Sequence, residues 1–218
     1  IFQSFEFNYY SWKYELGKDL HNRLCLVLLE DSEEIYAIFP LYIDSRYRLR
    51  FINDHHADFC DYISIKPIDF REIYNYLKST VKFQSFSLMN LRRESKIYND
   101  ILCLHNLHSV VRLGAEYSML NIDQGDFPYN VPHYRSHQKH RINKANRKYE
   151  QKESILFNQQ DHPFPEKELL YLRDLMISSG SRQYNFFTDD RLKLIESLYR
   201  SGLVVLHFMK DQNRINAC

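Results

Sequence analysis

The chain has 218 residues, of which 44% are hydrophobic and 26% are charged, and its formal net charge is +1. This length and balance indicate a folded globular protein with one large core or two smaller ones. Only five residues are glycine, and no two of them lie within ten residues of each other. A Walker loop, a dinucleotide-binding G-x-G-x-x-G turn and a G-x-S-x-G nucleophile elbow are therefore excluded, because each needs closely spaced glycines.

The sequence lacks the usual patterns of a transmembrane segment, a signal peptide and a cysteine metal site. No apolar run approaches the roughly 20 residues that cross a bilayer, and the first residues lack the pattern of a signal peptide. We therefore expect a cytoplasmic protein without a membrane span. The cysteines at positions 25, 60, 103 and 218 have no C-x-x-C spacing, so we expect neither a zinc site nor a redox pair. Because the chain begins with Ile1 and ends partway through an expected strand, we expect a fragment.

The first half of the chain is predicted to begin with a helix and continue as a strand meander. The helix covers Ser4–Leu16, with an inward face formed by Phe5, Tyr9, Trp12 and Leu16. A polar turn at 31–34 then separates two β-rich runs and predicts a hairpin. A further helix follows Asp69, a residue type that caps helices, and its apolar face is Phe70, Ile73, Tyr74 and Leu77. The predicted strands are Arg23–Glu30, Ile35–Tyr42, Arg48–Ile52, Asp61–Ile65, Phe83–Leu91 and Val110–Ile122.

The second half is predicted to open with a basic helix near Tyr134–Gln151. A short strand follows, then two helices, the second of which has Thr188 as a plausible cap and an apolar stripe. A strand, a turn and the beginning of a returning strand are predicted at the end of the chain. These later elements are Ser154–Asn158, helices near 166–178 and 189–201, Leu203–Met209 and a strand that begins at Ile215; the stripe of the second helix is Leu192, Ile195, Leu198 and Tyr199.

The basic helix is the largest charge anomaly. Arg135–Lys152 contains seven basic residues and one acidic residue, a net charge of +6 that leaves −5 for the rest of the chain. Three interpretations stay open: a solvated face, a surface for an anionic ligand or substrate, and a nucleic-acid contact. The candidate ligand-binding residues are Lys139, Arg141, Lys144 and Arg147.

Three histidines lie near one side of the same helix. His133, His137 and His140 have a spacing that a metal face would use. The surrounding lysines and arginines oppose a dication, and no carboxylate is close in sequence to offset them. We expect these to be surface histidines and predict no metal site.

A second candidate site is the polar run at 53–62, which follows a predicted strand. It concentrates acids, imidazoles and a thiol, and loops after strands often carry functional groups. A polar turn is the simplest interpretation; substrate binding or acid–base chemistry is the alternative. The candidates for such chemistry are Asp58, Asp61 and His56, each of which would need a shifted pKa to act as a base.

Several segments together resemble a known family, the Fem-like branch of the GNAT acyltransferases, which is associated with polysaccharide or cell-envelope biosynthesis. The matching segments run through almost the whole chain in the same order. They are Phe2–Phe7 with Trp12, Ala37–Tyr42, Leu49–Ile52 leading to Ala57–Tyr62, the basic helix Lys139–Tyr149, and Leu203–Leu206.

The resemblance implies an α/β (α+β mixed) fold of two GNAT-like units in tandem, each a mixed sheet flanked by helices. The first unit would cover residues 1–130, and the second, incomplete unit residues 131–218. In the first unit, Asp69 and Glu72 lie at the helix start where a CoA pyrophosphate would dock, so this unit is expected not to bind CoA. The phosphate-binding turn of the second unit would lie beyond Cys218.

The activity implied is transfer of an acyl group from acyl-CoA to an amine, for example an amino sugar or an envelope precursor. Acyl-CoA would be a co-substrate and no cofactor would be bound tightly. Asp58 and Asp61 are the candidates for the acceptor side, and the basic helix for an anionic ligand. Two alternatives stay open: transfer from aminoacyl-tRNA, and a non-enzymatic module whose basic helix binds nucleic acid or an acidic partner.

Overall fold

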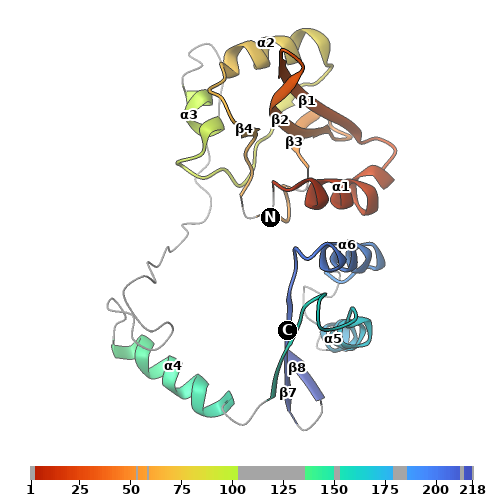
Figure 1. Ribbon diagram of the computed structural model, residues 1–218, viewed down its shortest axis with the longest axis vertical. Helices are drawn as coiled ribbons and strands as arrows, with labels where there is room; N and C mark the ends of the chain where they lie inside the picture. Colours follow the sequence, from red (N-terminus) through yellow and green to blue (C-terminus); the bar gives the residue numbers. More distant parts are fainter. Residues whose placement is uncertain are drawn as a thin grey trace. The chain divides into compact units, whose positions relative to one another are not determined.

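A computed structural model describes residues 3–52, 54–57, 59–102, 136–149, 153–178, 186–211 and 214–217. It confirms a mixed α+β fold (Figure 1). The chain forms two compact units, and the division does not follow chain order: Ile1–Val111 and Asn185–Val204 form the first, while Arg112–Tyr184 and Val205–Cys218 form the second. This differs from the boundary expected at residue 130, because a late helix belongs to the first unit.

The first helix, α1, covers Phe5–Tyr14 and begins where the Ser4 hydroxyl accepts a hydrogen bond from the Phe7 N–H at 3.2 Å. Its expected inward face is wrong, since Phe5 and Tyr9 are exposed and Phe7, Asn8 and Ser11 are buried. The two exposed rings instead stack on each other, with centroids 5.4 Å apart. These two rings thus pair at the surface instead of being buried. The spacing of apolar residues alone cannot distinguish a surface pair from a buried face.

A tight turn follows α1 and depends on Gly17. The 3-10 helix η1, Leu16–Lys18, follows α1 directly. A Cβ atom at Gly17 would lie 2.8 Å from the Trp12 carbonyl oxygen and 3.0 Å from two atoms of its indole ring. Only glycine allows this close approach, and the Trp12 ring in turn lies against Tyr42, with centroids 6.3 Å apart.

The predicted hairpin is confirmed. Strands β1, Arg23–Asp31, and β2, Glu34–Ile43, pair antiparallel through a turn in which Ser32 and Glu33 have φ of 50° and 75°. Three shorter strands complete this sheet: β3 and β4 pair antiparallel with β2, and β5 pairs parallel with β3. They are β3 (Arg48–Phe51), β4 (Ile63–Ser64) and β5 (Ser85–Phe86), so the predicted strands at 61–65 and 83–91 are shorter than expected.

Helix α2, Phe70–Thr80, begins and packs as its sequence predicts. The Asp69 carboxylate accepts the Arg71 N–H at 2.8 Å. Phe70, Ile73 and Leu77 are buried against the sheet. The core beneath them consists of side chains with no more than 2% exposure, including Phe39, Leu41, Leu49 and Phe51. A short helix, α3 (Lys96–Leu102), follows and was not predicted; the predicted strand at 110–122 lies outside the described residues.

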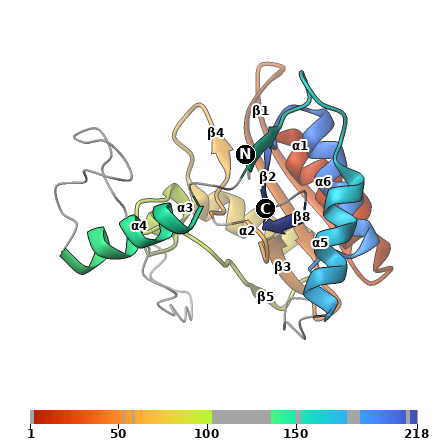
Figure 2. The ribbon, with the colours of Figure 1, turned by 90° about the horizontal axis from the view of Figure 1, so that it is seen from below.

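Helix α6, Asp189–Arg200, completes the first unit by packing beside α1 (Figure 1, Figure 2). Its predicted cap is confirmed, since the Thr188 hydroxyl accepts the Arg191 N–H at 3.1 Å. Its buried face is Arg191, Leu194, Leu198 and Tyr199, while the predicted Leu192 and Ile195 are half-buried. The apolar stripe is therefore rotated by about one residue from the prediction.

The second unit contains a three-stranded antiparallel sheet, in which β7 pairs with both β6 and β8. The Phe157 and Phe208 rings pack edge to face, with centroids 5.4 Å apart, and Phe208 is fully buried. The predicted basic helix, strand, helix and closing strand pair are all present. Their bounds are α4 (Ser136–Tyr149), β6 (Glu153–Phe157), α5 (Glu166–Ser178), β7 (Leu206–Asp211) and β8 (Arg214–Ala217).

One ion pair lies inside the first unit. The Arg50 Nε and Nη2 atoms donate to the Asp54 carboxylate at 2.9 and 2.8 Å, and the two side chains are 4% and 0% exposed. Asp44 lies 3.6 Å from the same guanidinium and also holds Arg48. Desolvation raises the pKa of Asp54, and its hydrogen bonds from Arg50 oppose that rise.

We predict that Arg50→Met lowers the free energy of unfolding by about 3–5 kcal/mol, because it leaves the Asp54 carboxylate buried without a partner. The matched control is Arg200→Met, which removes an exposed pair with Glu196 at the same i,i+4 spacing and should cost less than about 1 kcal/mol. Urea unfolding followed by circular dichroism measures both. Equal losses in the two variants would contradict the special role of the buried pair.

Candidate functional site

The loop at 52–62 is held from two sides. Besides the Arg50 pair, the Asn90 side-chain amide donates to the carbonyl oxygens of Asp54 at 2.7 Å and Ala57 at 2.8 Å. The Asn90 carbonyl accepts the Cys60 N–H at 3.0 Å, and its φ of 55° is one that asparagine tolerates well. The polar run is therefore an anchored loop whose described part has a defined shape.

Asp61 is predicted to bind the amine substrate, but its carboxylate accepts hydrogen bonds from three backbone N–H groups. Its carboxylate accepts the N–H groups of Tyr62 at 2.9 Å, Lys96 at 3.1 Å and Ile97 at 3.4 Å. It therefore caps the start of α3. Burial raises the pKa of Asp61, and these hydrogen bonds oppose that rise. The other candidate, Asp58, lies outside the described residues.

A cavity of about 360 Å³ lies beside this loop, inside the first unit. Its size is within the range of small-ligand pockets. It combines two imidazoles with carboxylates, an amide and an aromatic ring, and it is formed by the end of α1, the 52–62 loop and the start of α6. The lining residues are Glu15, Leu16, Asn22, His55, His56, Phe186, Thr188, Asp190 and Arg191.

Ion pairs between α1 and α6 form one wall of this cavity. The Arg191 Nε donates to Glu15, and the side chains are 11% and 16% exposed. The Arg191 guanidinium also lies over the Phe186 ring, 5.3 Å from its centroid. Lys18 pairs with Asp190 at the rim. Each carboxylate thus has a cation beside it, so the wall is polar but close to neutral.

His56 is the group in this cavity with the most altered acidity. Desolvation, then the Arg191 cation, then His55, lower the pKa of His56 to about 4. The residue is nevertheless exposed, so its imidazole is neutral near pH 7, can accept a hydrogen bond there, and is a weaker base than an ordinary histidine. Its ring centroid lies 6.5 Å from that of His55. The sequence predicts His56 as a candidate base. It contains no pattern that predicts Glu15, Asp190 and Arg191 as its neighbours in the cavity.

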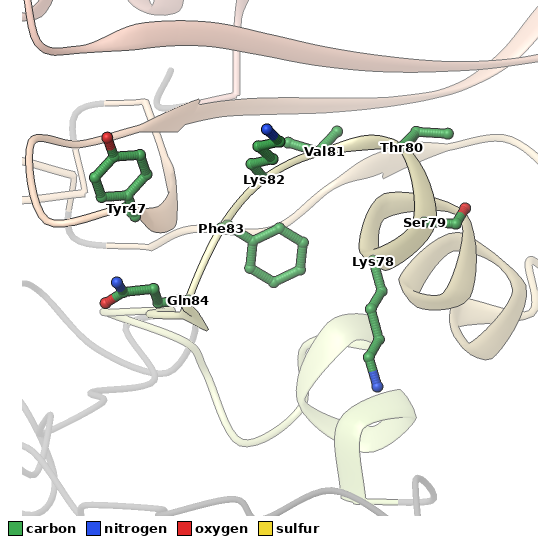
Figure 3. A pocket seen from close by; sticks show the side chains of 8 residues that line it. All are labelled: Tyr47, Lys78, Ser79, Thr80, Val81, Lys82, Phe83 and Gln84. Carbon is green, nitrogen blue, oxygen red and sulfur yellow. The ribbon is translucent and has the colours of Figure 1, made fainter.

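A second hollow, of about 410 Å³, lies where α2 ends (Figure 3). Tyr47 and the consecutive residues Lys78–Gln84 line it. Figure 3 shows Tyr47 at one end of this segment and the Phe83 ring beneath it. None of these lining residues is a histidine or a carboxylate, so the hollow lacks the acid–base groups of the first cavity.

The predicted ligand-binding residues of the basic helix are all exposed. Lys139, Arg141, Lys144 and Arg147 lie on α4, and the described histidines of that helix, His137 and His140, are exposed as well. His133 lies outside the described residues. Across the described ranges, no three His, Cys, Asp or Glu side chains gather as a metal site would require.

One serine–imidazole pair was not predicted. Ser154 Oγ and His207 Nε2 form a hydrogen bond across β6 and β7, and both residues are exposed. Nucleophilic serines usually need an imidazole that a third group orients. Among the described residues no carboxylate contacts His207, so this pair is weaker than the cavity as a catalytic candidate.

Models of known protein families, curated proteins and solved structures gave no match to the chain. Within the described ranges, no helix has both the length and the hydropathy that a membrane crossing requires.

We predict that His56 titrates with a midpoint near pH 4, measured by NMR of the imidazole nitrogens and assigned with His56→Asn. An ordinary histidine has a pKa of about 6.5. The unfolded state therefore takes up this proton first, and His56 reduces stability as the pH falls from about 6.5 to about 4. His56→Asn should gain stability relative to wild type at pH 5 compared with pH 7.5. A midpoint above 6 would contradict this.

We also predict that Asp61→Ala lowers the free energy of unfolding by about 1–2 kcal/mol through loss of the α3 cap. Asp61→Asn keeps one oxygen acceptor and should lose less. Hydrogen exchange measured on the Lys96 and Ile97 amides localises the effect, because both donate to this carboxylate. Unchanged protection of these amides in Asp61→Ala would show that the cap is dispensable.

Proposed function

We propose that the chain is part of an N-acyltransferase that moves an acyl group from acyl-CoA to an amine. The observation that carries this is the element order of residues 153–217. Along the chain a strand is followed by two helices and then by two strands, although the second helix, α6, packs in the first compact unit, and the sheet is antiparallel in the order β6-β7-β8. This is the order that the resemblance to the Fem-like GNAT acyltransferases implies, and the basic helix α4 precedes it as in the resemblance.

The first unit gives further support. It also contains a mixed sheet flanked by helices, with antiparallel β1, β2 and β3 and a parallel β5 that follows α2. Asp69 caps α2 with its own carboxylate. A carboxylate in this position repels an anion, which supports the proposal that the first unit does not hold the donor phosphates.

In this proposal the cavity of about 360 Å³ takes the amine acceptor. Glu15 and Asp190 are already paired with Arg191 and Lys18, so the acceptor is proposed to bind as a neutral amine that donates hydrogen bonds to their oxygens, and the Phe186 ring offers an apolar surface. Neutral His56 accepts the proton that the amine loses. The nitrogen attacks the thioester carbonyl carbon, the carbon–sulfur bond breaks, and the CoA thiolate takes this proton from His56 and leaves as a thiol.

The basic helix has the complementary role. The exposed cations Lys139, Arg141, Lys144 and Arg147 are proposed to bind the anionic donor. Acyl-CoA and aminoacyl-tRNA both carry phosphates, so both fit this charge. Assays with acyl-CoA and with aminoacyl-tRNA as the donor therefore distinguish the CoA-dependent reaction from the tRNA-dependent reaction of the same family.

We predict that the full natural polypeptide containing these residues releases CoA thiol from acetyl-CoA in the presence of amine acceptors such as glucosamine. Thiol release is followed with a disulfide dye. His56→Gln should lower kcat by about 10²-fold, the low end of the usual contribution of a general base, because a pKa of about 4 makes His56 a weak base at neutral pH, with a smaller change in KM. The matched control is His207→Gln in β7, outside the cavity, which should leave kcat within about twofold.

No thiol release across short and long acyl donors and a panel of amines would overturn the CoA-dependent proposal. Activity only with aminoacyl-tRNA would select the tRNA-dependent variant. Equal losses in the His56 and His207 variants would reject His56 as the proton acceptor while leaving the transferase proposal in place.

The second candidate function is a binding module for nucleic acid, favoured by the exposure of the α4 cations. Binding to tRNA or duplex should then weaken steeply with salt, because phosphate contacts release counterions. Arg141→Glu with Arg147→Glu should abolish it, while Lys193→Glu, an exposed cation on α6, should change it little. Binding insensitive to the α4 reversals would reject this role.

A further inference from the structure

Strand β1 has an edge without a partner in the described part of the chain. It pairs with β2 on one side, and the sheet order β1-β2-β3-β5 leaves it outermost. It is nine residues long, Arg23–Asp31. A long edge strand exposes N–H and C=O groups that can pair with another chain.

The solvent face of β1 is apolar. Leu24, Leu26 and Leu28 alternate on one face and are 45%, 52% and 51% exposed. The register places Ile38 and then Ile63 beside Leu28 on the neighbouring strands, and Ile63 is 40% exposed. Natural edge strands are commonly protected by lysine or proline, but β1 contains neither.

The charges of β1 are arranged so that the strand complements itself. Arg23 lies at its start and Glu30 and Asp31 at its end. In an antiparallel pair centred on Val27, Arg23 of one copy faces Asp31 of the other, Leu26 faces Leu28, and Leu24 faces Glu30. Opposite charges and apolar pairs directly opposite each other stabilise antiparallel strands, whereas like charges do not. A parallel pair in register would place like charges side by side.

We propose that β1 pairs antiparallel with β1 of a second copy of this chain, centred on Val27. The two sheets become one continuous sheet around a twofold axis, which is the commonest symmetry of soluble dimers. Leu26 of each copy then lies beside Leu28 of the other on the same face of the sheet, which removes part of their exposed area from water. This inference rests on the edge, burial and charge of β1 and is independent of the proposed acyltransferase function.

Sedimentation velocity of the full chain over a concentration series tests the proposal, and we expect a monomer–dimer equilibrium. Leu26→Lys adds a charge where two strands meet and should weaken the dimer at least a hundredfold. The control is Leu20→Lys, which places the same substitution at a leucine that is 93% exposed and lies outside β1; it should leave the dimer unchanged. Both sites are exposed, so both variants should fold.

Charge reversal tests the register. Arg23→Asp and Asp31→Arg should each weaken the dimer about tenfold, and the double variant should restore it. Asp31 also binds the Lys66 ammonium at 2.8 Å within its own chain, so Lys66→Gln controls for loss of that pair and should leave the dimer intact. A monomer at every concentration, a dimer that survives Leu26→Lys, or a double reversal that does not restore pairing would each overturn the proposal.

Discussion

The buried ion pair between Arg50 and Asp54 holds the loop that lines the cavity against the sheet of the first unit. A carboxylate without solvent is stable only if its partner is held in place, and Arg50 is held because it lies in a central strand, β3. The pair thereby joins the sheet to the loop that follows it. Asn90 fixes the same loop from a distant part of the chain, so the position of the cavity wall depends on both.

This arrangement divides the polar residues of the loop between two tasks. The described carboxylates are used for structure: Asp54 pairs with Arg50, and Asp61 caps α3. The imidazoles of His55 and His56 remain at the cavity. The described acids of this loop therefore stabilise the fold, and its two imidazoles are left to line the cavity.

The sequence predicts those features that depend on neighbouring residues. The β1–β2 hairpin and helix α2 follow from a polar turn, an Asp69 cap and regular apolar spacing, and all three are local. The cavity could not be predicted, because Glu15 and Arg191 lie 176 positions apart and meet only through the packing of α1 on α6. The inward face of α1 was also wrong, since spacing does not show whether two rings will stack at the surface.

Gly17 links the aromatic packing of α1 to the cavity, although it touches no ligand-facing group itself. Its neighbours are Leu16, which lines the cavity, and Lys18, which pairs with Asp190 at the rim. Any larger residue must displace either the Trp12 ring from Tyr42 or the η1 turn from the cavity. The requirement for glycine at a position outside the cavity lining therefore keeps the shape of the cavity fixed.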